Sequence, residues 1–252
     1  MDLSHAPIVF LHIPKTAGQT VHNSLSRIVK ARRVSPIRVH TQAATPQDQY
    51  PPGYSLYSGH LDWAAMDHLP AARFMFTVLR DPGERIASFY FYLQRAAASF
   101  DPATLQLPQN IGLKRALDWS PDDYFFGGDD AWQTFVHSHY DNFYCTYFAT
   151  RRMLGWGSTQ DQPRPKVLAK ARLGLGSIDQ VYFTKDMAQI EVAFQTRFGM
   201  HLRLADRYDN TSSEPASLLR WPRLLTSFAT DGATERMQNF VEWDQKLTNG
   251  LV

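Results

Sequence analysis

One succession of segments constrains the fold of this chain more than any other feature: a short apolar run, a bend and an amphipathic helix. Residues 7–12 (PIVFLH) are apolar without polar alternation, which is typical of a strand buried on both faces. Residues 20–30 carry apolar side chains at helical spacing, and Pro14 and Gly18 lie between the two segments. Because proline ends a strand and glycine permits a tight bend, the pattern predicts a strand, a loop and a helix.

The same succession returns between residues 73 and 98. Residues 73–79 form a second strand-like run, 80–83 (RDPG) predict a turn, and 84–98 repeat apolar side chains at helical spacing. Two such units indicate parallel strands covered by helices. Further strands are predicted at residues 34–40, 54–58 and 178–184, and further helices at 187–198, 215–229 and 232–247.

We therefore expect an α/β protein with a P-loop-like three-layer fold, in which a central parallel sheet is flanked by helices. A chain of 252 residues is long enough to bury one sizeable core, and α/β folds of this length are often undivided. We expect a single domain over residues 1–252, with a mostly helical insertion at about residues 99–165. This insertion is a candidate cover for an acceptor substrate.

Composition excludes several classes of protein. With one cysteine, Cys145, the chain forms no internal disulfide and no cysteine-rich zinc site, and no run approaches about 18 apolar residues. No basic-then-apolar signal opens the sequence, so we expect an unanchored cytoplasmic protein. The net charge is +2, with 19 Arg and 7 Lys but no basic run of five, which argues against nucleic-acid binding.

The first loop has the properties of an anion site. The segment PKTAGQT follows a buried strand and opens a helix, where free N–H groups and the helix dipole favour negative charge. The Walker pattern GxxxxGK(S/T) is absent, because Lys15 precedes Gly18 instead of following it. The backbone amides of residues 16–20, with Lys15 and the hydroxyls of Thr16 and Thr20, suit a phosphate. The alternative interpretation is a strand-to-helix turn with a surface lysine.

A second anion site is predicted after the second strand. Arg80 follows that strand directly, and Ser88 lies two turns into the next helix, so both are expected at the same end of the sheet as Lys15. The alternative interpretation is an ion pair between Arg80 and Asp81 or Glu84 in the loop.

Taken together and in this order, HIPKTAGQT and RDPGERIASFY resemble the 5'-phosphosulfate and 3'-phosphate motifs of sulfotransferases that use 3'-phosphoadenosine 5'-phosphosulfate (PAPS). Over residues 8–95 the chain resembles the carbohydrate branch that contains the heparan sulfate 2-O- and 6-O-sulfotransferases. The resemblance implies that Arg80 and Ser88 bind the 3'-phosphate. It also implies that the 5'-phosphosulfate is surrounded by Lys15, Thr16, Ala17, Gly18, Gln19 and Thr20. Gln19 stands where threonine or serine is common, so one hydroxyl contact is missing.

A general base is predicted in the segment YSGHLDW, residues 57–63. His60 ends a predicted strand, and an imidazole titrates near neutrality, so it can take the proton of an attacking hydroxyl. The segment resembles the catalytic-histidine segment of both relatives, although Ser58 stands where the 2-O enzymes have a second histidine. The alternative interpretation is a structural histidine.

Several other residues are weaker candidates. His137 and His139 form an HxH pair without an assignable third ligand, so we predict no metal. Asn142 is expected to cap a helix, and Cys145 is expected in the core. Residues 210–212 resemble a family segment near the adenosine, which makes Thr211 and Ser212 cofactor candidates. The aromatic side chains of residues 119–144 favour a core over a sugar-stacking surface.

The sequence thus predicts a sulfotransferase that moves the sulfuryl group of PAPS to an acceptor hydroxyl, with His60 as base, Lys15 stabilising the leaving group and 3',5'-bisphosphoadenosine (PAP) as product. The resemblance favours a saccharide or glycoconjugate acceptor. Two alternatives remain open: a P-loop-like small-molecule kinase that uses ATP and Mg²⁺, and a non-catalytic nucleotide-binding module. The sequence specifies neither the acceptor nor the oligomeric state.

Overall fold

The computed structural model describes residues 6–29, 33–204 and 219–251. Two compact units divide the chain. The first comprises residues 1–80, 147–153 and 169–214, and the second comprises 81–146, 154–168 and 215–252. In the described parts of the chain, no helix has both the length and the apolarity required to cross a membrane.

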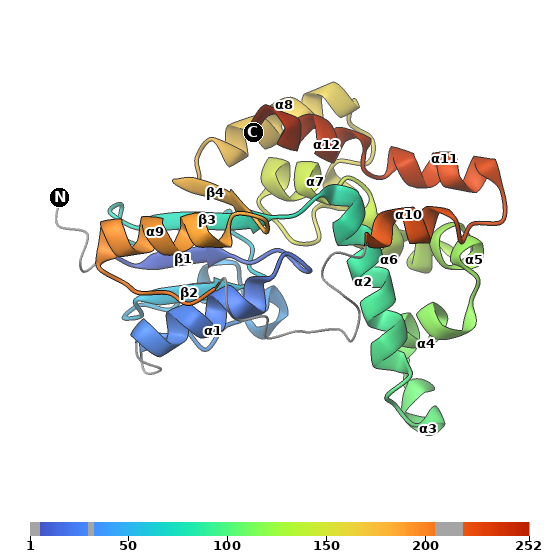
Figure 1. The fold of residues 1–252 in the computed structure, drawn as a ribbon, viewed down its shortest axis with the longest axis horizontal. Helices are drawn as coiled ribbons and strands as arrows, with labels where there is room; N and C mark the ends of the chain where they lie inside the picture. Colours follow the sequence, from blue (N-terminus) through green and yellow to red (C-terminus); the bar gives the residue numbers. More distant parts are fainter. Residues whose placement is uncertain (1–5, 30–32, 205–218, 252) are drawn as a thin grey trace. The chain divides into compact units, whose positions relative to one another are not determined.

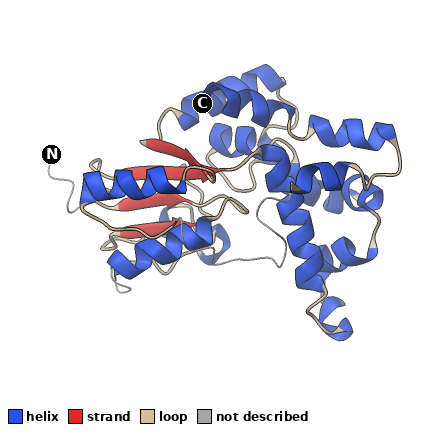
Figure 2. Cartoon of the chain, in the orientation of Figure 1, coloured by secondary structure: helices blue, strands red, loops and turns tan. Residues whose placement is uncertain are grey.

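A four-stranded parallel sheet forms the centre of the first unit (Figures 1 and 2). Its strands lie in the order β2-β1-β3-β4, and adjacent strands are all parallel. Their bounds are β1 Ile8–Leu11, β2 Leu56–Gly59, β3 Phe74–Leu79 and β4 Gln180–Phe183. The predicted α/β class, with a central parallel sheet flanked by helices, is confirmed.

Two helices cover one face of this sheet, α1 (Gly18–Val29) and α9 (Met187–Phe198) (Figure 1). Side chains alternate between the two faces of a strand, so every second residue of β1 and β3 points to the helices. The shared core contains Ile8 and Phe10 of β1, Phe74, Phe76 and Val78 of β3, Val21 and Leu25 of α1, and Ile190 and Phe194 of α9. The expected α9 bounds, 187–198, are confirmed.

The strand predicted at residues 34–40 is wrong. The chain makes only isolated bridges with β2 there, at Val34 and Val39. Pro36 explains the interruption, because proline has no N–H to donate to a ladder and is tolerated only at a sheet edge. The segment nevertheless runs parallel to β2 and ends beside it in a 3-10 turn, His40–Gln42.

The second unit is helical (Figure 2). Its helices are α2 Pro82–Ala97, α3 Pro102–Leu105, α4 Ile111–Asp118, α5 Pro121–Phe126, α6 Asp130–Tyr140, α10 Arg220–Leu225, α11 Asp231–Asn239 and α12 Glu242–Thr248. Helices α7 (Phe143–Thr150) and α8 (Arg164–Leu175) contribute residues to both units. Further 3-10 turns occur at Gln47–Gln49, Pro108–Asn110, Trp156–Ser158 and Asn249–Leu251.

Side-chain caps explain where many of these helices start. The side chains of Asp81, Asp101 and Ser120 each accept a hydrogen bond from the backbone N–H three residues on, and each is followed by proline. A capping oxygen satisfies a free N–H of the first turn, and proline at the first position lacks the N–H that would otherwise be unsatisfied. The Asp-Pro and Ser-Pro pairs therefore mark helix starts.

The helix predicted at residues 232–247 is two helices, α11 and α12, because a distant residue separates them. Asn142, left-handed at φ 45°, donates through its backbone N to Phe240 O and through Nδ2 to Asn239 O. Its Oδ1 accepts from Trp243 N and Asp244 N in the first turn of α12. The side chain of Asn142 therefore caps α12, a helix 100 residues away in the sequence, whereas the predicted cap was of the helix that Asn142 itself precedes, α7.

Asp244 makes the reciprocal contact. Its carboxylate, 1% exposed, accepts from Tyr144 N at 2.9 Å and from Cys145 N at 2.8 Å, in the first turn of α7. Burial raises the pKa of Asp244 from 3.8 to about 6, against the opposing effects of these hydrogen bonds and of Arg85. Because the folded pKa is the higher one, the stability contributed by this carboxyl is present below pH 3.8 and is lost as the pH rises through 6.

We predict that Asp244→Asn removes this pH-dependent loss of stability. The difference in unfolding free energy, variant minus wild type, should rise by about 2 to 3 kcal/mol between pH 4 and pH 7. Changed hydrogen bonds in the variant add a difference that is the same at both pH values and does not affect this rise. Urea unfolding at both pH values measures the difference. Asp161→Asn, at an exposed position, is the control and should show no such change. A pH-independent offset for Asp244→Asn contradicts the prediction.

Candidate active site

The loop between β1 and α1 has an unusual backbone. Lys15 and Ala17, on either side of Thr16, are both left-handed, with φ values of 72° and 59°. Non-glycine residues enter this region at a cost of about 1–2 kcal/mol each, which is typical of functional sites. Left-handed residues alternating with ordinary ones turn successive N–H groups toward one point, forming a nest for an anion.

Thr16 and Gly18 hold the loop in this shape. Thr16 is fully buried, and its Oγ1 donates to Ile13 O at 2.9 Å. A Cβ on Gly18 would lie 1.8 Å from Cδ2 of the His12 ring, so only glycine fits there. The first turn of α1 holds no acidic residue, which leaves its N-terminal N–H groups and dipole available to an anion.

The remaining loop residues differ in exposure. Lys15 is half-buried, and Thr20 is 8% exposed. Gln19 is exposed and its Nε2 donates to Asn23 Oδ1 at 3.1 Å, along the surface of α1. The amide that replaces the usual hydroxyl at position 19 therefore bonds within the helix.

His60 directly follows β2, and its hydrogen bond fixes its tautomer. Its Nδ1 lies 2.7 Å from His12 O. A carbonyl oxygen can only accept, so Nδ1 carries the proton and Nε2 keeps its lone pair. Burial lowers the pKa of His60 below 6.5, and Arg38 and His40 lower it further, while the bond to His12 O opposes them. The ring is therefore neutral at pH 7 with Nε2 available as a base.

The two residues after Leu61 anchor this segment. Asp62 Oδ1 accepts from Met153 N at 2.7 Å, and its backbone N donates to Gln49 Oε1 at 2.8 Å. Trp63 is buried, its N donates to Arg151 O, and the Arg151 guanidinium lies 4.7 Å from its ring centroid. Asp62 and Trp63 thus have structural roles beside His60 that the sequence motif alone did not reveal.

Three polar residues at this end of the first unit were not predicted. His12 lies one residue beyond β1, and its ring centroid is 4.4 Å from that of His60. His22 Nδ1 lies 3.0 Å from Ser58 Oγ, and its Nε2 accepts from Arg38 Nη1. Ser58, which stands where the 2-O enzymes have a second histidine, thus contacts the imidazole of His22. Register gives the signal for His12: Leu11 pairs with Gly59, so the next residues, His12 and His60, lie side by side.

Burial keeps these imidazoles neutral. It lowers the pKa of His12 well below 6.5, and the nearby His60, Arg38, His22 and Lys15 lower it further. Burial, with the charge of Arg38, also lowers the pKa of His22 to about 4. Positive charge at this end of the sheet therefore comes from other side chains, among them Lys15, Arg38 and Arg80, which follows β3.

The two predicted 3'-phosphate ligands lie in different units. Arg80, half-buried, directly follows β3 in the first unit. Ser88, 7% exposed, lies in the second turn of α2 in the second unit. The carboxylates near Arg80 have structural contacts within the second unit, Asp81 Oδ1 with Glu84 N and Glu84 Oε1 with Trp221 N. Thr211 and Ser212 lie outside the described residues.

The weaker candidates have structural contacts. His137 Nδ1 pairs with Asp141 Oδ2 at 3.0 Å and its ring stacks on Trp156, while His139 Nδ1 donates to Phe135 O. The described part of the chain contains no group of three His, Cys, Asp or Glu arranged to hold a metal. Cys145 is buried, as predicted. Most aromatic side chains of this region are core, as predicted: Tyr124, Phe125, Trp132, Tyr140 and Tyr144 are at most 3% exposed, while Trp119 and Phe126 are only partly buried against the same cluster.

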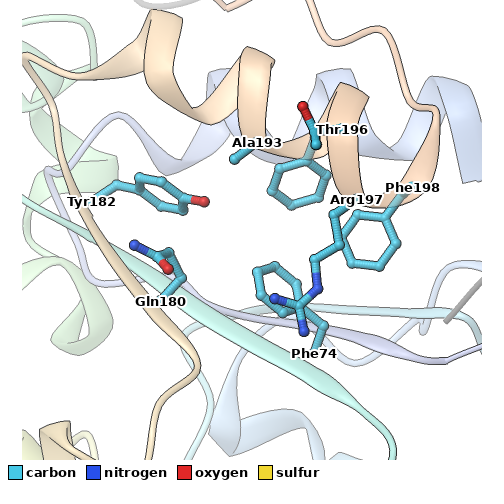
Figure 3. A pocket seen from close by; sticks show the side chains of 8 residues that line it. Phe74, Gln180, Tyr182, Ala193, Thr196, Arg197 and Phe198 are labelled. Atoms are coloured by element: carbon cyan, nitrogen blue, oxygen red, sulfur yellow. The ribbon is translucent and has the colours of Figure 1, made fainter. Parts of the chain in front are cut away.

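A cavity of about 300 Å³ lies at the opposite, amino-terminal end of the strands (Figure 3). It is lined by the first residues of β3 and β4, Phe74 and Gln180, and by the end of α9. The Arg197 guanidinium lies 4.3 Å from the Phe74 ring centroid (Figure 3). The candidate site lies at the carboxyl ends of the strands, where ligands of parallel sheets usually bind. The cavity lies at the other ends of the strands and is therefore separate from the site.

Part of the chain matches a known protein family. Residues 2–123, just under half of the chain, match the model of a sulfotransferase family. The matched region contains the loop after β1, His60, Arg80 and Ser88. No curated protein matches the chain. The family match supports sulfate transfer as the chemistry of this region and does not favour the kinase alternative.

We predict that Gly18→Ala displaces the loop after β1 or the His12 ring and destabilises the fold. Its Cβ would overlap the His12 ring, so the loop or His12 must move, and we expect a loss of about 1–3 kcal/mol in unfolding free energy. Thermal unfolding measures it. Gly157→Ala is the matched control, because its Cβ would meet nothing within 4 Å. Equal melting temperatures for both variants would contradict the packing argument.

Proposed function

We propose that this protein transfers the sulfuryl group of PAPS to a hydroxyl of a carbohydrate acceptor, releasing PAP. The observation that carries the proposal is the ring of His60, held by His12 O with Nε2 unprotonated, within a region that matches a sulfotransferase family. The carbohydrate acceptor rests on the resemblance of residues 57–63 to the carbohydrate enzymes. We further propose that both units serve one sulfotransferase domain, with residues 99–165 as an insertion.

The loop after β1 fits the phosphosulfate end of PAPS. Its left-handed residues, Lys15 and Ala17, form a nest that a tetrahedral anion fills, and Lys15 adds a cation. In this proposal residues 15–20 hold the 5'-phosphosulfate, and Arg80 and Ser88 hold the 3'-phosphate. Thr211 and Ser212 are proposed near the adenosine. When bound, PAPS supplies an activated sulfuryl group on a bisphosphate leaving group.

Proton removal is assigned to His60. Nε2 accepts the proton of the acceptor hydroxyl as that oxygen attacks, and the Nδ1–H bond to His12 O keeps the ring in the required tautomer. The carbonyl dipole also stabilises the imidazolium that forms. Such general-base catalysis typically contributes about 10² to 10⁴ in rate.

Electrostatic stabilisation is assigned to Lys15 and the loop amides. The leaving oxygen gains negative charge, and preorganised N–H groups with an ammonium stabilise that charge without reorganisation. Removing one such group typically lowers the rate by about 10² to 10³, so Lys15→Ala should be nearly inactive.

The first test is calorimetric titration with PAP, with 5'-AMP and with ATP plus Mg²⁺. We predict that PAP binds most tightly of the three, because only PAP carries both a 5'-phosphate and a 3'-phosphate. Arg80→Ala should lower the affinity for PAP about 10- to 100-fold by removing a charged hydrogen-bond donor, and should change the affinity for 5'-AMP far less. Arg172→Ala, exposed on α8, is the control. Binding of ATP with Mg²⁺ but not of PAP would replace the proposal with a kinase.

The second test addresses His60. His60→Gln should reduce transfer of radiolabelled sulfate from PAPS to a pool of oligosaccharides by about 10² to 10⁴, with PAP affinity unchanged. Since burial lowers the pKa of His60, the wild-type rate should hold as the pH falls to 6.5 and decline only below it.

The control for this test is His201→Gln, at an exposed position outside the site. It should retain both the rate and the pH profile of the wild type. A wild-type midpoint above pH 6.5, or a His60→Gln variant that keeps its activity, would remove His60 as the base.

A further inference from the structure

The cavity at the amino-terminal ends of β3 and β4 has mostly aromatic walls (Figure 3). Its volume is about 300 Å³, and all the residues that line it belong to the first unit. Phe74 is 2% exposed, and its ring centroid lies 5.8 Å from that of Phe194 and 5.2 Å from that of Phe198. Tyr182, 6% exposed, supplies a fourth ring. Because sites for small organic molecules are mostly apolar with a few placed polar groups, these walls favour a flat hydrocarbon ring over an inorganic ion.

Three polar side chains line the same cavity from two sides. Gln180 and Tyr182 belong to β4, and Arg197 belongs to the last turn of α9 (Figure 3). Among the residues that the structure describes, the side chains of these three form no hydrogen bond with one another or with any other residue. Their hydrogen-bonding capacity is therefore open to a ligand.

The charge of Arg197 has no acidic partner in the described parts of the chain. Its guanidinium carbon lies 4.3 Å from the centroid of the Phe74 ring and 5.8 Å from that of Phe198. A guanidinium that contacts an aromatic ring through its face keeps its N–H groups in its own plane, where they still donate. None of the described residues that line the cavity is acidic. The complementary ligand is therefore an anion.

Tyr182 adds an uncharged donor near this cation. Burial raises the pKa of Tyr182 above 10.0, and the nearby charge of Arg197 opposes the rise. The hydroxyl therefore keeps its proton at neutral pH and can donate to an anion. Figure 3 shows it pointing into the space between β4 and α9.

We propose that this cavity binds a small aromatic acid, with the carboxylate held by Arg197 and Tyr182 and the ring among the aromatic walls. Cavities for drug-sized ligands span about 300–1,000 Å³, so this one takes a single ring rather than a nucleotide. The site goes beyond the proposed function. It lies at the opposite ends of the strands from the loop after β1 and depends on neither His60 nor PAPS.

The test compares two probes of the same shape, 4-fluorobenzoate and its uncharged amide 4-fluorobenzamide. Binding of each to the full chain is followed by fluorine NMR. We expect 4-fluorobenzoate to bind with a Kd of roughly 1 mM, as suits so small a ligand. The amide should bind about tenfold more weakly, because it lacks one charged bidentate contact. Saturation with PAP should change neither affinity.

Arg197→Gln should bring the two affinities within about twofold of each other. Arg27→Gln, exposed on α1 over the same face of the sheet, is the matched control and should keep the preference for the acid. Arg197→Lys retains the charge without the planar pair of donors and should keep only part of that preference. Melting temperatures show whether each variant folds.

Tyr182→Phe is the second test, and it decides the matter if the Arg197 variants fail to fold. It removes only the hydroxyl, so the affinity for 4-fluorobenzoate should fall about threefold to tenfold while the affinity for the amide changes less. An unchanged affinity for the acid contradicts the role of Tyr182.

Three further outcomes overturn the assignment: no saturable binding of the acid up to about 10 mM, equal binding of both probes, or a preference that survives in Arg197→Gln. Displacement of the acid by PAP would place the probe in the candidate active site and also overturns it. If the protein fails to bind PAP but binds the acid through Arg197, the cavity site stands and only the proposed function fails.

Discussion

The contact between His12 and His60 joins the proposed base to the loop after β1. His12 N donates to Gly59 O at 3.1 Å, and the ring of His60 donates back to His12 O at 2.7 Å. The ring of His12 meanwhile covers Gly18, where α1 begins. One residue thus uses its N–H, its carbonyl and its ring to connect β1, β2 and the anion-binding loop. Because the connection is mostly backbone, it fixes the geometry of the base without depending on long, flexible side chains.

The electrostatics of the first unit follow from burial. Burial favours the neutral form of an imidazole, which keeps one N–H, so His12, His22 and His60 contribute hydrogen-bonding atoms without charge. Positive charge comes from Lys15 and from Arg38, whose guanidinium bonds to His22 and lowers the pKa of all three imidazoles. In a partly desolvated environment each of these charges acts more strongly than in water.

Local patterns predicted the sheet strands and long helices well, and non-local contacts account for the errors. Apolar runs and helical spacing are encoded within ten to fifteen residues, which is why the bounds of α9 were predicted. The strand predicted at 34–40 failed because Pro36 prevents a continuous ladder, a signal present in the sequence but outweighed by the apolar pattern. The break between α11 and α12 depends on Asn142, far away in the chain. His12 and Arg38 were missed for the same reason, since strand register and edge pairing bring them beside His60.

The reciprocal caps of the second unit affect the order in which the chain folds. Asp244 satisfies the first N–H groups of α7, and Asn142 satisfies those of α12, so each helix start is completed by a residue about 100 positions away. During synthesis α7 emerges long before Asp244, and its first turn remains bonded to water until the last helix arrives. Closing so long a loop has a high entropic cost, which makes this docking a late event in folding. The helical unit therefore reaches its final state only after the C-terminal segment has joined it.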